Sequence, residues 1–183
     1  MKSIVAHSLD PDGTAAGQDL VVGITADGPV EPALGLLFVS AKLDAQPILD
    51  AINARWPGMP LIGCSTDGEA SGEQRCRRAS AVFAVIHDTT ATIRTGICRD
   101  LSAGIDGSVR RGWAEASSGG DINRDLGLLF SDALTVSGDQ VVACLQQHAG
   151  EHLPFYGGLA ADCWEFSATY QFYNDEVTQD AAV

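Results

Sequence analysis

Leu34-Gly35-Leu36-Leu37-Phe38 is an apolar pentapeptide that recurs further along the chain as Leu126-Gly127-Leu128-Leu129-Phe130. A short apolar run of this kind is typical of a strand that is buried on both faces. The duplication therefore predicts two equivalent strands, each of which begins a repeated unit.

An amphipathic helix is predicted after each copy of the pentapeptide. The apolar positions are Ile48, Leu49, Ile52 and Trp56 in the first helix, and Val141, Val142, Leu145 and Ala149 in the second. Both sets follow the i, i+1, i+4, i+8 spacing of a helix with one buried face. Asp44 and Pro47 predict the first helix start, and a capping-box pattern at Ser137 and Gln140 predicts the second. Pro57 and Gly150 end the two helices.

Each predicted helix leads to a second apolar run that ends in a turn of small residues with a carboxylate. The two runs are Pro60-Leu61-Ile62-Gly63-Cys64-Ser65-Thr66-Asp67 and Pro154-Phe155-Tyr156-Gly157-Gly158-Leu159-Ala160-Ala161-Asp162. Strand, helix and strand in this order predict a right-handed crossover between parallel strands. We therefore expect a single domain, residues 1–183, with two pseudo-repeats at about 34–88 and 126–183.

The segments around the two units predict antiparallel strands and one more helix. They are a hairpin of residues 80–86 and 91–97, a glycine-weakened helix near 105–113, a strand at 168–173, a turn at 174–176 and the start of a strand at 180–183. Together they predict an α/β fold with mixed β-sheet layers and flanking helices.

Composition excludes several classes of partner. The formal net charge of −13 disfavours binding to nucleic acid and to anionic membranes. No apolar run is long enough to span a bilayer, and the first residues do not form a signal peptide. Five cysteines without a Cys-x-x-Cys pair fit a reduced, cytoplasmic protein.

Three segments of the chain together resemble the N-terminal region of FIST domains. They are residues 62–69 (Ile-Gly-Cys-Ser-Thr-Asp-Gly-Glu), 128–132 (Leu-Leu-Phe-Ser-Asp) and 155–162 (Phe-Tyr-Gly-Gly-Leu-Ala-Ala-Asp), the last followed by 169–173 (Thr-Tyr-Gln-Phe-Tyr). The resemblance implies a cytoplasmic sensory domain of bacterial-type signal transduction that binds small ligands such as amino acids. Some members bind haem and respond to nitric oxide. It also implies a FIST C-terminal region or a signalling output protein as partner, and we expect that region to be absent from this chain.

The turns after the predicted strands are the candidate ligand site, because loops at strand ends commonly bind ligands in α/β sheets. The candidate ligand-binding residues are Cys64, Ser65, Thr66, Asp67, Asp132, Gly157, Gly158, Asp162, Trp164 and Tyr173. The carboxylates would pair with a cationic group, and Arg94 or backbone N–H groups would pair with a ligand carboxylate. The alternative is that the hydroxyls and carboxylates bond their own backbone and only shape the turns.

Two other functions stay open at this stage. Cys64 is a candidate nucleophile of a hydrolase if His7 or His152 lies beside it, although a buried Cys is more often a small apolar residue. Haem needs one axial histidine and an apolar pocket. The candidates for that ligand are His7, His87, His148 and His152.

Residues 148–152 (His-Ala-Gly-Glu-His) match the pattern of a zinc-binding helix, but Gly150 and Pro154 break that helix. We therefore expect no metal. We also expect no cofactor and no catalytic residue, with haem and the Cys64 nucleophile as the alternatives. Arg75, Arg77 and Arg78 form a basic cluster that is typical of a solvated strand edge.

Overall fold

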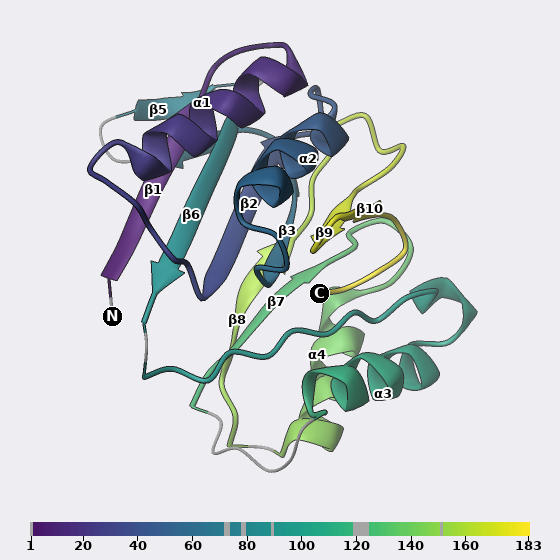
Figure 1. The fold of residues 1–183 in the computed structure, drawn as a ribbon. Helices are drawn as coiled ribbons and strands as arrows, with labels where there is room; N and C mark the ends of the chain where they lie inside the picture. The colour runs from purple at the N-terminus through teal and green to yellow at the C-terminus, as the bar shows by residue number, and fades with distance from the viewer. Residues whose placement is uncertain (1, 72–73, 78–79, 89, 119–124, 151) are drawn as a thin grey trace.

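The computed structural model describes residues 2–71, 74–77, 80–88, 90–118, 125–150 and 152–183 (Figure 1). In chain order the elements are β1 (Lys2–Ser8), α1 (Gly13–Thr25), β2 (Leu34–Ser40), α2 (Ala45–Arg55), β3 (Leu61–Thr66), β4 (Glu69–Ser71), β5 (Gln74–Arg77), β6 (Ala81–His87), α3 (Ile105–Ala116), β7 (Gly127–Ser131), α4 (Gly138–Ala149), β8 (Phe155–Leu159), β9 (Gln171–Tyr173) and β10 (Glu176–Thr178). In the part of the chain described, no helix is both long and apolar enough to cross a membrane.

A six-stranded mixed sheet forms the centre of the molecule, in the order β1-β6-β2-β3-β9-β10. β2 and β3 are parallel and are joined through α2, as the first strand–helix–strand unit predicts. The neighbours of this pair, β6 and β9, are antiparallel to it. The prediction of an α/β fold with a mixed sheet is confirmed.

Two helices cover one face of this sheet (Figure 1). The Asp12 side chain caps α1 by accepting from the Ala15 backbone N–H, and Asp44 caps α2 by accepting from that of Gln46. Buried side chains of α1 and α2, such as Leu20 and Ile48, pack on the sheet in one apolar core. The sequence analysis did not predict α1.

The second unit packs on the opposite face of the sheet. β7 and β8 are parallel and joined through α4, and α3 lies beside α4. The rings of Phe38 and Phe130, which occupy the same position in the two pentapeptides, meet edge to face at 5.2 Å. The Ser137 side chain makes no capping hydrogen bond, so the predicted capping box is wrong; this residue is exposed to solvent.

The predicted hairpin of residues 80–86 and 91–97 is also wrong. β6 is paired on one side with β1 and on the other with β2, so neither of its edges is left for residues 91–97. That segment is not a strand, and Cys98 instead forms an isolated bridge with Ala182. The expected strand at 180–183 is reduced to bridges at Ala182, while β10 takes the last strand position of the sheet.

Candidate functional site

Ser65, at the end of β3, joins the two turns that the sequence identifies as candidate sites. Its hydroxyl donates to the Ala161 carbonyl at 2.7 Å and accepts from the Tyr170 backbone N–H at 2.9 Å. The Ser65 carbonyl also accepts from the Ala161 N–H at 2.9 Å. The turns after β3 and β8 therefore lie side by side, although the two strands belong to different sheets.

The carboxylates of Asp132 and Asp162 accept hydrogen bonds from the protein itself, mainly from backbone N–H groups of the turns that follow them. The Asp132 carboxylate accepts from the Leu134 and Thr135 N–H groups at 2.8 and 2.7 Å, and from the Thr169 hydroxyl at 2.7 Å. Burial alone would raise the pKa of Asp132, but these hydrogen bonds outweigh it and lower the pKa. The Asp162 carboxylate accepts from the Ser167 and Ala168 backbone N–H groups, and hydrogen bonds from the backbone likewise lower the pKa of Asp162. Both carboxylates thus shape turns.

Asp67 differs from these two carboxylates. Its Oδ1 atom is buried and has no hydrogen-bond partner among the described residues. The neighbouring Thr66 hydroxyl is engaged, because it donates to Glu69, which also accepts from Ser80. Burial raises the pKa of Glu69 despite those two bonds. Asp67 therefore has one carboxylate oxygen that no described residue bonds, but it lines neither of the two cavities described below.

The remaining predicted residues do not gather in one place. Tyr173 is buried in the core with its hydroxyl donating to Glu115 at 2.7 Å, whereas the Trp164 side chain is 73% exposed. Gly157 and Gly158 lie in β8, where the chain is exposed. These residues do not form a common pocket with Ser65.

Cys64 is placed poorly for nucleophilic chemistry. Its side chain is 4% exposed, and burial, followed by the charge of Glu69, raises the pKa of the thiol to about 12. His7 lies in β1, three strand spacings or about 14 Å from β3. His152 lies beyond the end of α4.

We expect Cys64 to alkylate in the folded protein at least about a thousandfold more slowly than free cysteine at pH 8. The raised pKa leaves very little thiolate, and burial limits access further. Mass spectrometry after timed iodoacetamide labelling checks this, with the less buried Cys163 as internal control. Labelling of Cys64 as fast as Cys163 would support the nucleophile instead.

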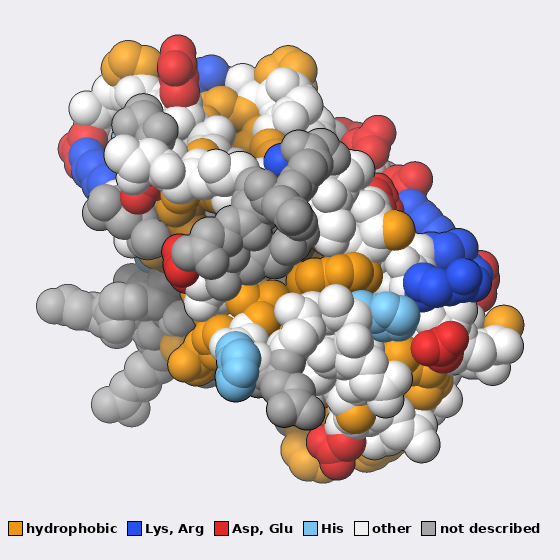
Figure 2. Space-filling model, turned by 90° about the horizontal axis from the view of Figure 1, so that it is seen from below, with side chains coloured by type: hydrophobic (Ala, Val, Ile, Leu, Met, Phe, Trp, Pro, Cys, Tyr) orange, Lys and Arg blue, Asp and Glu red, His pale blue; other side chains and the backbone are white. Residues whose placement is uncertain are grey.

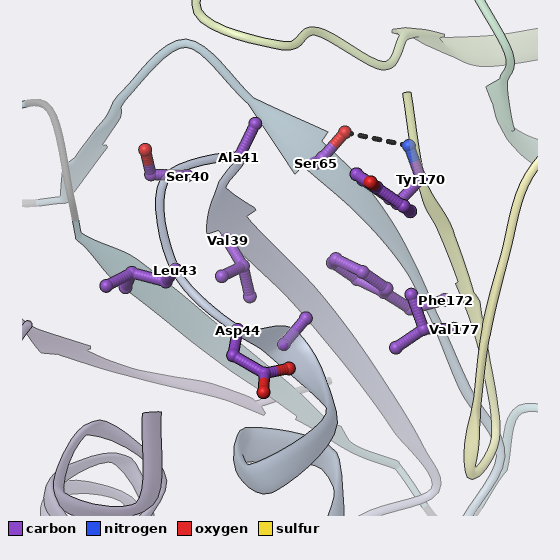
Figure 3. Close-up of a pocket in the computed structure, with 10 residues that line it drawn as sticks. Val39, Ser40, Ala41, Leu43, Asp44, Ser65, Tyr170, Phe172 and Val177 are labelled. Atoms are coloured by element: carbon purple, nitrogen blue, oxygen red, sulfur yellow. Dashed lines mark hydrogen bonds between the residues drawn. The ribbon is translucent and has the colours of Figure 1, made fainter. Parts of the chain in front are cut away.

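A small cavity of about 220 Å³ adjoins Ser65 at the carboxyl ends of β2 and β3 (Figure 3). Its walls include Val39, Leu43 and Phe172, and Asp44 lies at its side. The volume is below the roughly 300 Å³ at which ligand pockets usually begin. The Ser65 hydroxyl is already bonded on both sides, and Asp44 caps α2.

A larger cavity of about 620 Å³ lies between the six-stranded sheet and the second unit. Figure 2 shows hydrophobic side chains gathered near the middle of the lower face of the molecule. The apolar lining includes Leu34, Ile62 and Ile86 of the sheet, Trp113 of α3, and Leu128, Leu129 and Phe155 of the β7–β8 unit. Residues 90–96, Leu145 of α4 and Val183 also contribute to the lining. Arg94 and Asp125 contribute one cation and one anion to the same lining.

None of the ten predicted site residues lines the larger cavity. Residues 90–96 line this cavity, but residues 91–97 were predicted to form a strand of a sheet. Arg94 was named as a partner for a ligand carboxylate, but nothing in the sequence indicated where it lies. None of the four histidines lines either cavity, so neither cavity offers haem an axial histidine, and haem binding stays an untested alternative.

A family model described as the FIST N domain matches residues 33–183, which include both strand–helix–strand units and the residues that line both cavities. No curated protein and no solved structure gives a significant match. FIST domains are a family of small-ligand sensory domains in signal transduction and are not typically enzymes. Because this match covers most of its length, the chain belongs to the FIST N domain family.

Proposed function

We propose that this domain binds an amino acid, or a related small metabolite, in the larger cavity and passes that signal to a partner. The observation that carries the proposal is an apolar cavity of about 620 Å³ with Arg94 and Asp125 in its lining. Small-molecule sites are typically cavities of about 300 to 1,000 Å³ with apolar walls and a few polar groups that orient the ligand.

Arg94 suits the carboxylate of such a ligand. A guanidinium is always charged and presents its N–H groups in a planar fork that matches a carboxylate. One of these groups, on Nη1, donates to the Ser118 carbonyl just after α3, which holds the side chain beside the cavity. The Arg94 side chain is thus tethered before any ligand binds, and less rotamer entropy is lost on binding.

Asp125 suits the ammonium group of the same ligand. It directly precedes the Leu126-Gly127 start of the second pentapeptide and is exposed to solvent. One cation and one anion in a mainly apolar lining suit the zwitterion and the side chain of an apolar amino acid. The indole of Trp113 adds a large flat surface for that side chain.

The position of the cavity fits a sensory role. Its walls come from the six-stranded sheet on one side and from α3 and the β7–β8 unit on the other. A ligand that contacts both units favours the arrangement in which both contacts form. The partner that reads this arrangement is a FIST C-terminal region or a signalling output protein.

A thermal-shift screen against amino acids and related metabolites tests the proposal. A ligand at 100 times its dissociation constant stabilises the folded state by about 2.7 kcal/mol, which raises the melting temperature measurably. We expect Arg94→Gln to abolish the shift and Arg94→Lys to weaken it, because Lys keeps the charge but loses the planar fork.

Arg110→Gln is the matched control, because Arg110 is exposed on α3 and does not line the cavity. Asp44→Asn tests the smaller cavity instead, and Asn preserves the helix cap there. A ligand shift that survives Arg94→Gln but is lost in Asp44→Asn would move the site to the smaller cavity. The absence of any shift across the whole panel would contradict the proposal.

A further inference from the structure

Asp106, Cys144 and His148 bring three metal-ligating atoms together between α3 and α4. Cys144 and His148 stand one helical turn apart on α4, and Asp106 lies in the first turn of α3. Asp106 Oδ1 is 3.7 Å from Cys144 Sγ and 3.7 Å from His148 Nε2. All three atoms lie within 4.8 Å of one another.

These distances are close to those between the ligands of a tetrahedral metal. Zinc bonds of about 2.3 Å to sulfur and about 2.0 Å to nitrogen or oxygen place two ligand atoms about 3.3 to 3.5 Å apart. Movements of about an ångström or less would therefore bring these three side chains into a zinc coordination sphere. The Asp106 side chain is 77% exposed, so it is able to make this adjustment without repacking the core.

One polar atom of the cluster, His148 Nε2, is not satisfied by the protein itself, whereas the Cys144 thiol donates to Asp106. His148 Nε2 is buried and has no hydrogen-bond partner among the described residues. Its separation from Asp106 Oδ1 is too long for a hydrogen bond. A buried ring nitrogen without a partner costs free energy, and a bound metal ion would remove that cost.

We propose that Asp106, Cys144 and His148 form a site for a divalent transition-metal ion of the zinc class. Thiolate, imidazole and carboxylate are the ligand types that zinc takes, and three protein ligands leave a fourth position for water. On binding, the Cys144 thiol releases its proton to solvent, because the thiolate is the ligand. The bound ion ties the start of α3 to the end of α4.

This site differs from the His-Ala-Gly-Glu-His pattern that the sequence suggested. α4 ends at Ala149 and Gly150 adopts φ +91°, so His152 does not continue the helical face that carries His148. The other two members of the cluster are instead Cys144, one turn earlier on α4, and Asp106 on α3. This proposal departs from the expectation that the chain has no metal site.

Titration of the untagged protein with Zn²⁺ in competition with a chromophoric chelator tests the site. We expect one equivalent of Zn²⁺ to bind. Loss of an outer-shell partner typically weakens metal binding by about 10- to 100-fold, so His148→Gln, which removes a direct ligand, should weaken it by more than about 100-fold. Asp106→Asn should weaken binding by about 10- to 100-fold, since it keeps an oxygen but loses the charge. His152→Gln is the matched control and should bind Zn²⁺ as the parent does.

The absorption spectrum of the Co²⁺-loaded protein gives a second readout, which does not depend on the stability of the fold. A sulfur-to-cobalt charge-transfer band should appear in the parent and in His152→Gln, and should be absent in Cys144→Ser. The proposal is overturned if Zn²⁺ binds the parent and His148→Gln equally, if it does not bind the parent, or if the cobalt band survives in Cys144→Ser. Circular dichroism confirms that each variant is folded.

Discussion

Gly157→Ala is expected to destabilise the domain by more than about 4 kcal/mol, in the range that marks a severe local conflict. A Cβ at this position would lie 1.7 Å from the Leu129 carbonyl oxygen of the neighbouring strand, and the residue has φ +152°. The clash is with backbone in a parallel strand pair, so no side-chain movement relieves it. Urea unfolding followed by circular dichroism measures the loss.

Gly158→Ala, at the adjacent position, is the matched control. A Cβ there meets nothing within 4 Å, and Ala in a strand costs less backbone entropy than Gly. We expect Gly158→Ala to be neutral or to stabilise by up to about 1 kcal/mol. Equal effects of the two substitutions would show that the close approach of β7 and β8 at Gly157 is wrong.

Asp132→Ala is expected to lower the free energy of unfolding by about 3 to 5 kcal/mol. The residue is 2% exposed, and loss of its carboxylate leaves two backbone N–H groups and the Thr169 hydroxyl without their acceptor, while the Thr135 hydroxyl keeps Asp180. Asp132→Asn keeps one oxygen acceptor and should lose less. The exposed Asp27→Ala serves as control and should stay within about 0.5 kcal/mol of the parent.

The pH dependence of stability gives an independent check on Asp132. Its folded pKa is lowered, so the stabilisation is fully present above the unfolded value of about 3.9 and is lost as pH falls through the folded pKa. The difference in unfolding free energy between the parent and Asp132→Asn should therefore shrink below about pH 4. A difference that is constant with pH would show that the ionised carboxylate does not hold this loop.

The sequence predicts the two strand–helix–strand units because hydrophobic periodicity is a local signal. The first pentapeptide strand and the stripe of Ile48, Leu49 and Ile52 are buried as their apolar pattern predicts, whereas the second pentapeptide strand is only half-buried. Strand pairing is not local in this sense. The apolar run of residues 91–97 resembles a strand, but β1 takes the edge of β6 that it would need.

The candidate site is predicted less well, for a related physical reason. Small residues and carboxylates after a strand suit both ligand binding and turn formation, and the structure shows Asp132 and Asp162 bonded to their own loops. The larger cavity is assembled from segments far apart in the chain, such as Leu34, Arg94 and Trp113. No spacing along the sequence carries that information. The grouping of Asp106 with Cys144 and His148 was missed for the same reason.

The position of the bound ligand tests the central claim most directly. Amide chemical shifts of ¹⁵N-labelled protein, titrated with the amino acid that gives the largest thermal shift, report which residues surround it. The account predicts that the largest changes fall in residues 90–96, in β7 and in α3 near Trp113, which line the larger cavity. Changes confined to residues 39–45 and 170–172, around the smaller cavity, would contradict it.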